Sequence, residues 1–137
     1  MSITAIAYPY KSDYRLDPLG KSFKFAMPAT QTYLKNSYGL DGNILVGKGD
    51  ENTAMLRNVC GWVRLNIKGD GEIVHSIKLR GNNNEQVAGE INVNINDATS
   101  TLTTTAANAL TEVTLNCPNG VRLSSEATEF YIALPPQ

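Results

Sequence analysis

Hydrophobic and polar residues alternate one by one along much of this 137-residue chain. The clearest example is residues 90–96, where Ile91, Val93 and Ile95 alternate with three asparagines. The same period of two recurs in residues 63–67, 73–79, 113–117 and 130–134. Such alternation is typical of strands that bury one face and leave the other in water. The pattern therefore predicts antiparallel sheets rather than helices.

Turn-forming residues separate these segments. Gly69-Asp70-Gly71 and Pro118-Asn119-Gly120 each predict a tight hairpin between two strands. Residues 23–28 and 43–46 predict two earlier strands. About eight or nine short strands at this spacing predict an all-β fold, an antiparallel β-sandwich in one domain spanning residues 1–137. Its expected core comprises Val63, Leu65, Ile77, Leu79, Ile91, Val93, Ile95, Val113, Leu115, Phe130 and Ile132.

Composition narrows the class of protein. Charged residues make up 18% of the chain, against about 25% in typical globular domains. Asparagine and threonine, at 14 and 12 residues, supply polarity instead, which favours a β protein outside the cell. The net charge of −1 leaves no basic stripe for nucleic acid. The longest apolar run, residues 130–134, is far shorter than the ~20 residues of a membrane-spanning helix.

No segment predicts catalysis, a metal site or a cofactor. Residues 42–49 resemble a phosphate-binding loop, but their centre is Ile-Leu-Val and the final Ser or Thr is missing. His75, the only histidine, shares its phase with Ile73 and Ile77, which favours a core or rim residue over a ligand or general base. The one acidic cluster, residues 50–52, is too small for a calcium loop.

Three residues leave two interpretations open. Cys60 and Cys117 can form one disulfide, which suits an exported domain, or remain two separate thiols. Trp62 falls on the solvent side of its strand by phase, so Trp62 and the six tyrosines can offer ring faces to a glycan. Trp62 can instead be covered by a loop or by a neighbouring domain, which is the commoner case for an aromatic residue on the solvent side of a sandwich. The residues alone do not decide between these alternatives.

Four stretches together resemble the fimbrillin-like family of Bacteroidales surface proteins. They read Leu-Arg-Asn-Val-Cys-Gly-Trp at 56–62, Ser-Ile-Lys-Leu-Arg-Gly-Asn at 76–82 and Val-Ala-Gly-Glu at 87–90. The closing Thr-Glu-Phe-Tyr-Ile-Ala-Leu-Pro-Pro at 128–136 is similar to the end of that family's N-terminal domain. The resemblance covers residues 56–136 and includes nothing specific before them.

This resemblance implies an exported, lipid-anchored precursor with two transthyretin-like β-sandwich domains. Members serve as stalk, tip or anchor subunits of fimbriae, assemble by donating a strand to a neighbour, and are not enzymes. The chain departs from the family pattern because it carries no lipoprotein leader and stops where a second domain normally follows. The expectation is therefore the N-terminal module of a longer surface protein.

Two functions follow as hypotheses. The first is a non-catalytic structural or adhesive module at the cell surface or outer membrane, whose partners are other surface or fimbrial subunits added by strand pairing. The alternative is an extracellular module that binds host or microbial glycans through Trp62. Neither function requires a cofactor, nucleic acid or a membrane-spanning segment.

Overall fold

The computed structural model describes residues 4–12, 14–16, 22–39, 42–50, 52–94 and 109–135, which form strands and contain no α-helix. The all-β class and the sandwich architecture are confirmed. The described residues contain twelve strands rather than eight or nine, because short strands at 4–8, 15–16, 30–32, 54–58 and 109–110 lie outside the segments that alternation predicted. The strands are β1 (Thr4–Tyr8), β2 (Arg15–Leu16), β3 (Ser22–Met27), β4 (Thr30–Thr32), β5 (Leu45–Gly49), β6 (Ala54–Asn58), β7 (Gly61–Ile67), β8 (Ile73–Arg80), β9 (Ala88–Asn94), β10 (Ala109–Leu110), β11 (Glu112–Arg122) and β12 (Thr128–Leu134).

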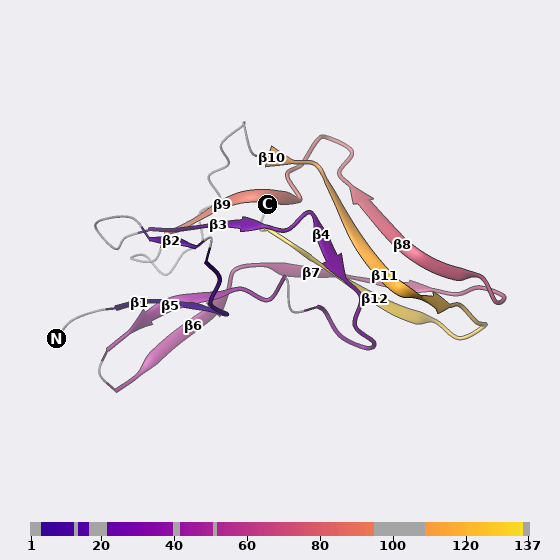
Figure 1. Ribbon diagram of the computed structural model, residues 1–137, viewed down its shortest axis with the longest axis horizontal. Helices are drawn as coiled ribbons and strands as arrows, with labels where there is room; N and C mark the ends of the chain where they lie inside the picture. The colour runs from indigo at the N-terminus through magenta and orange to yellow at the C-terminus, as the bar shows by residue number, and fades with distance from the viewer. Residues whose placement is uncertain are drawn as a thin grey trace.

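One layer of the sandwich contains the sheets β10-β9-β3-β2 and β4-β11-β8. β3 continues into β4 across Pro28, which has no N–H to donate to a ladder. β9 lies between β3 and β10, and all these pairings are antiparallel. Beyond the start of β9, β4 pairs directly with β11 in a parallel register that sets Thr30 against Thr114. Figure 1 shows this layer above the other sheets.

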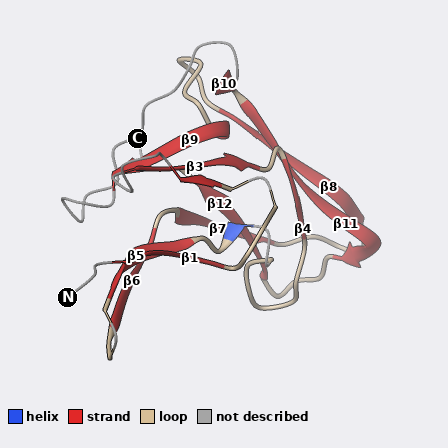
Figure 2. Ribbon diagram, turned by 60° about the vertical axis from the view of Figure 1, so that its left-hand side comes forward, coloured by secondary structure: helices blue, strands red, loops and turns tan. Residues whose placement is uncertain are grey.

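The opposite layer contains the sheets β1-β5-β6 and β12-β7. β6 runs into β7 through Val59 and Cys60, and the Val59 N–H donates to the Ile44 carbonyl at 2.9 Å. This bond extends the β5–β6 ladder toward β7. Figure 2 shows β1, β5 and β6 at one end of this layer and β7 and β12 behind them.

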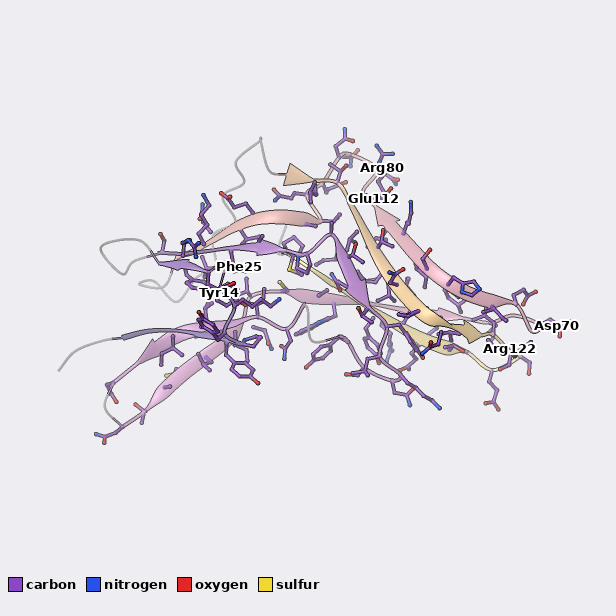
Figure 3. The ribbon with its side chains drawn as sticks, viewed as in Figure 1. Tyr14, Phe25, Asp70, Arg80, Glu112 and Arg122 are labelled. Carbon is purple, nitrogen blue, oxygen red and sulfur yellow. The ribbon has the colours of Figure 1, made fainter. Side chains whose placement is uncertain are left out.

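Two hydrophobic clusters fill the space between the layers. The first joins β3, β5, β9 and the β6–β7 connection, and Tyr14 packs edge-on against Phe23 at its margin, beside Phe25 (Figure 3). The second joins β11 and β12. Six predicted core residues are at most 1% exposed, four are half-buried, and Ile95 lies outside the described residues. The fully buried six are Ile91, Val93, Val113, Leu115, Phe130 and Ile132, and the half-buried four are Val63, Leu65, Ile77 and Leu79.

The hairpin predicted at Gly69-Asp70-Gly71 is wrong. β7 pairs with β12 and β8 pairs with β11, so this turn carries the chain from one layer to the other. Its backbone instead pairs with the β11–β12 connection, where the Gly69 N–H donates to the Ser124 carbonyl at 2.8 Å. Arg122 also donates to the Gly71 carbonyl at 3.0 Å, and Figure 3 shows Arg122 near Asp70 at this end of the molecule.

The hairpin predicted at Pro118-Asn119-Gly120 is also wrong. These residues form a bulge inside β11, which keeps β8 as its partner on both sides. Gly120 takes a φ of +69°, a left-handed conformation that suits a glycine at a bulge. The register shift turns Val74 toward the second cluster, so His75 is exposed and Ile73 is 48% exposed. The predicted common face of Ile73, His75 and Ile77 is therefore broken at this bulge.

Candidate strand-acceptor edge

The hydrogen bonds of Gln31 show which backbone groups of the β12–β7 sheet point outward. Its side chain is 3% exposed. The Ala133 N–H donates to Gln31 Oε1 at 2.8 Å, and Gln31 Nε2 donates to the Ala133 carbonyl at 2.8 Å. Ala133 lies opposite Trp62 on β7. Because both Ala133 groups bond to Gln31, the Ala133–Trp62 pair is a non-hydrogen-bonded pair of the antiparallel ladder.

This assignment fixes the rest of β7. Ladder bonds alternate along an antiparallel pair, so the N–H and C=O groups of Trp62, Arg64 and Asn66 point away from β12. These groups form what we call the β7 edge. Among the described residues, no backbone or side-chain partner satisfies them, and β12 is the only strand paired with β7. The β7 edge therefore presents backbone donors and acceptors in strand geometry.

The other edge of the sheet is closed at one point. By the same alternation, the backbone groups of Glu129 and Tyr131 on β12 point away from β7. The Gln31 amide occupies that edge immediately beside them, at Ala133. A strand that approached β12 would have to displace this buried amide. The β7 edge offers the easier place for a strand to add.

Apolar side chains beside the β7 edge are incompletely covered. Leu65 and Ile67 of β7, and Val74, Ile77 and Leu79 of β8, are half-buried and pack against the second cluster. By contrast, the residues of β11 and β12 at the centre of that cluster are at most 2% exposed, namely Val113, Leu115, Cys117, Phe130 and Ile132. Among the described strands, β7 and β8 lie at the edges of their sheets, so no described strand covers the second cluster on this side.

Charged groups lie on the solvent face of the same sheet. The Tyr131 hydroxyl donates to Glu129 Oε2 at 2.7 Å, and Arg64 Nη1 lies 3.8 Å from Glu129 Oε1. The neighbouring Glu129 carboxylate raises the pKa of Tyr131, because it accepts a hydrogen bond from the protonated hydroxyl. An exposed ion pair of this length contributes little to stability. These three side chains lie on the solvent face of the sheet and make no hydrogen bond to the backbone groups of the β7 edge.

Trp62 is half-buried, and an aromatic side chain covers it. Tyr38, from the connection between β4 and β5, stacks on the indole with ring centroids 4.6 Å apart and planes inclined by 25°. The indole also packs against the first cluster. Its Nε1 is buried and has no acceptor in the part of the chain that the structure describes. Trp62 is thus covered by a loop residue, Tyr38, which is one of the six tyrosines considered with it as a glycan platform.

The two cysteines are free thiols in different clusters. Cys60 belongs to the first cluster, with its Sγ 3.5 Å from Met27 Sδ, while Cys117 belongs to the second. Of the two interpretations, the structure holds separate thiols and not the Cys60–Cys117 disulfide. Burial raises the pKa of Cys60 to about 12 and raises that of Cys117 as well.

The buried Cys60 thiol predicts a loss of stability in alkali. A thiol with a raised folded pKa stabilises the fold below its unfolded pKa of about 9, and this contribution is lost as pH rises toward 12. The steepest expected slope is about 1.4 kcal/mol of unfolding free energy per pH unit. Urea denaturation measured from pH 8 to about pH 12 should show that Cys60→Ala loses less unfolding free energy per pH unit than the parent. An identical slope in parent and variant would remove Cys60 as its cause.

The remaining candidate residues build no reactive site. His75 is exposed on β8, and residues 45–49 of the apparent phosphate loop form strand β5. Asp50 Oδ1 accepts hydrogen bonds from the backbone of Asn52 and Thr53, which lowers the pKa of the carboxyl and caps the β5–β6 turn. Within the described ranges, no three metal-ligating side chains come together. No helix there is long and apolar enough to cross a bilayer.

The β7 edge and Gln31 were not predicted from the sequence. Gln31 sits between two threonines in a segment without clear alternation, and nothing distinguishes it from a solvated polar residue. Comparisons with protein-family models, with curated proteins and with solved structures find no match to this chain, so the candidate site rests on its geometry.

Proposed function

We propose that this chain is a non-catalytic structural or adhesive module of a cell surface, and that its β7 edge accepts an extended segment from a neighbouring surface or fimbrial subunit. The observation that carries the proposal is an open backbone edge beside half-buried apolar side chains. Strand addition uses both features, because main-chain hydrogen bonds supply affinity and alternate side chains supply specificity.

The geometry defines the partner segment. Three outward residues on β7 offer N–H and C=O groups to a strand of about five or six residues. One face of that strand would lie against Leu65 and Ile67 of β7 and Ile77 of β8, so its inward residues should be apolar. Its outward residues would join Arg64 and Glu129 on the solvent face and should be polar. The expected partner is therefore an alternating segment.

Other features support a surface location. A low charge content with much asparagine and threonine is typical of exported β domains, and the resemblance to fimbrillin-like proteins points to a lipid-anchored precursor. The free thiols are also compatible with an oxidising exterior, because both are buried in separate clusters. Surface labelling of intact source cells with an antibody against this chain would test the location.

A proline substitution tests the edge. Arg64→Pro removes an outward N–H and leaves the bonds to β12, since proline is tolerated where the N–H of an edge strand faces solvent. The probe is a peptide of about ten residues with alternating valine and threonine and a lysine at each end. Calorimetry should show that Arg64→Pro weakens binding at least about tenfold, a loss of about 1.4 kcal/mol.

Matched controls separate the backbone from the side chain. Arg64→Ala removes the same side chain and the 3.8 Å contact with Glu129 but retains the N–H, so it should bind like the parent. A peptide of the same composition with its valines grouped should not bind. Equal losses in Arg64→Pro and Arg64→Ala, with both variants folded, would show that the β7 backbone is not the acceptor.

Glycan binding is a second candidate, favoured by one observation. Tyr38 and Trp62 form a stacked pair, and the buried Trp62 Nε1 has no acceptor within the described residues. The outward ring face of Tyr38 can pack on the apolar face of a sugar ring. Tyr38→Ala is the cleaner variant because Trp62 also supports the core. Robust binding on a glycan array that disappears in Tyr38→Ala would favour this function over strand addition.

A further inference from the structure

The apolar row on the inward face of β7 ends at a glycine. Gly61 is the first residue of β7 and pairs with Leu134 on β12. Side chains alternate between the two faces of a strand, so Gly61 shares its face with Val63, Leu65 and Ile67. Its cross-strand neighbour Leu134 packs against the second cluster, as do Leu65 and Ile67. Gly61 itself is exposed, so the row has an uncovered position with no side chain at this end.

Neither backbone conformation nor crowding requires a glycine at position 61. Its φ lies outside the left-handed region, unlike that of Gly120. A Cβ built on Gly61 would meet no described atom within 4 Å, whereas one built on Gly47 would collide with the Met55 carbonyl oxygen. Glycine weakens a strand and often marks a place where a ligand or another backbone approaches closely. Gly61 leaves room that the described part of the chain does not fill.

The hydrogen-bonding pattern of β7 shows what would face this glycine. The backbone groups of Trp62 point away from β12, so those of Gly61 point toward it. An antiparallel strand added at the β7 edge would therefore form a hydrogen-bonded pair at Trp62 and a non-hydrogen-bonded pair at Gly61. The Cα atoms of a non-hydrogen-bonded pair are about 4.5 Å apart, against about 5.5 Å in the other kind. A large side chain opposite Gly61 would lie directly over the glycine.

We propose that the segment bound at the β7 edge runs antiparallel to β7 and places an aromatic residue opposite Gly61. This inference rests on the proposed strand addition and adds the residue that sets its register. An aromatic side chain opposite a glycine covers the glycine backbone and stabilises the strand pair. With no side chain in the way, the ring would extend across Gly61 toward Leu134 and lie beside the half-buried Val63. A valine in the same place would cover less of this space.

The antiparallel direction fixes where the aromatic residue stands in the segment. The partner residues opposite Leu65 and Val63 come first, and the residue opposite Gly61 follows the one opposite Trp62. The expected partner is therefore an alternating segment of about six residues whose last inward residue is phenylalanine, tyrosine or tryptophan.

Three peptides with a common frame of alternating valine and threonine, and a lysine at each end, test this assignment. The first has phenylalanine in place of its last valine, the second has phenylalanine in place of its first valine, and the third keeps every valine. Calorimetry with the parent should show that the first peptide binds about fivefold tighter than the third. The second peptide has the composition of the first and should bind within about twofold of the third.

Gly61→Val tests the receiving position, because it fills the space above the glycine. It should reduce the preference for the first peptide over the third from about fivefold to none. Ser76→Val is the matched control, since it adds the same side chain at an exposed strand position on β8, and it should retain the preference. Circular dichroism melts check that each variant is folded, and Gly61→Ala replaces Gly61→Val if the latter is not.

The outcomes separate this proposal from strand addition itself. Equal binding of all three peptides to the parent, tighter binding of the second, or a preference that persists in Gly61→Val would overturn the aromatic assignment. Loss of the preference in Ser76→Val as well would also overturn it. In each of these cases, binding of the all-valine peptide that is sensitive to Arg64→Pro would leave the β7 edge as the acceptor. If none of the three peptides binds, strand addition fails, and the aromatic assignment fails with it.

Discussion

Replacing Gln31 with leucine is expected to lower the unfolding free energy by about 2–5 kcal/mol, because two buried backbone groups lose their partners together. Leucine nearly matches the volume of glutamine but can neither accept from the Ala133 N–H nor donate to its carbonyl. Each buried polar group left without a partner costs about 1–3 kcal/mol. A typical domain has only about 5–15 kcal/mol of net stability, so this loss is large.

Urea denaturation of Gln31→Leu measures this loss, with Thr32→Ala as the control. Thr32 follows Gln31 on β4 but is exposed, and its removal should change stability by about 0.5 kcal/mol or less. Gln31→Leu should also accelerate amide exchange at Ala133. A variant that retains parental stability would mean that the Gln31 amide is not the partner of Ala133. The outward direction inferred for the backbone groups of Trp62, Arg64 and Asn66 would then have no support.

Val93→Asp is expected to prevent folding at neutral pH. Val93 is 1% exposed in the first cluster, on the central strand β9, and a carboxylate there would be buried without a partner. Burying an unpaired charge costs several kcal/mol even after relaxation. Desolvation raises the folded pKa of such a carboxyl, so the penalty is greatest above pH 4–5 and shrinks as pH falls and the group is protonated.

Far-UV and near-UV circular dichroism of Val93→Asp tests the core, with Ile73→Asp as the matched control. Ile73 is also an aliphatic strand residue, but it is 48% exposed beside the β11 bulge. Its substitution should cost about 1 kcal/mol or less. If Val93→Asp melts like the parent while Ile73→Asp unfolds, then Val93 lies outside the core and Ile73 lies inside it, contrary to the structure.

Alternation predicted the strands well because its cause is local. A residue that points inward must be apolar whichever strand pairs with it, so the pattern found β7, β8, β9, β11 and β12. It also placed Val93, Leu115 and Phe130 correctly in the core. The earlier strands β3 and β5 follow the segments expected at 23–28 and 43–46 within a few residues.

Pairing could not be predicted in the same way. Gly69-Asp70-Gly71 has hairpin residues, but β7 pairs with β12 and β8 pairs with β11, so the chain crosses between layers there. Pro118-Asn119-Gly120 likewise fits a turn. It forms a bulge within β11 instead, because β11 pairs with β8 on both sides of it. The sequence carries local turn preference, whereas the choice of partner depends on the whole sandwich.

The candidate site was hidden for a related reason. The β7 edge consists of backbone groups, which every residue has, so no residue type in the sequence indicates it. Its openness follows from the number of strands in the sheet and from one buried amide, Gln31. The sequence did nominate Trp62 on the same strand, but as a side-chain site rather than as a backbone acceptor.

Amide hydrogen exchange along β7 tests the central claim most directly. In the chain alone, the amides of Val63, Leu65 and Ile67 should be protected by β12, while those of Trp62, Arg64 and Asn66 should exchange rapidly. The alternating valine–threonine peptide should then protect the second set, and the grouped-valine peptide should not. Rapid exchange of the second set in the chain alone, followed by peptide-dependent protection, is the predicted result. Equal protection of both sets without peptide, or no protection at Arg64 with a saturating amount of it, would contradict the strand-acceptor account.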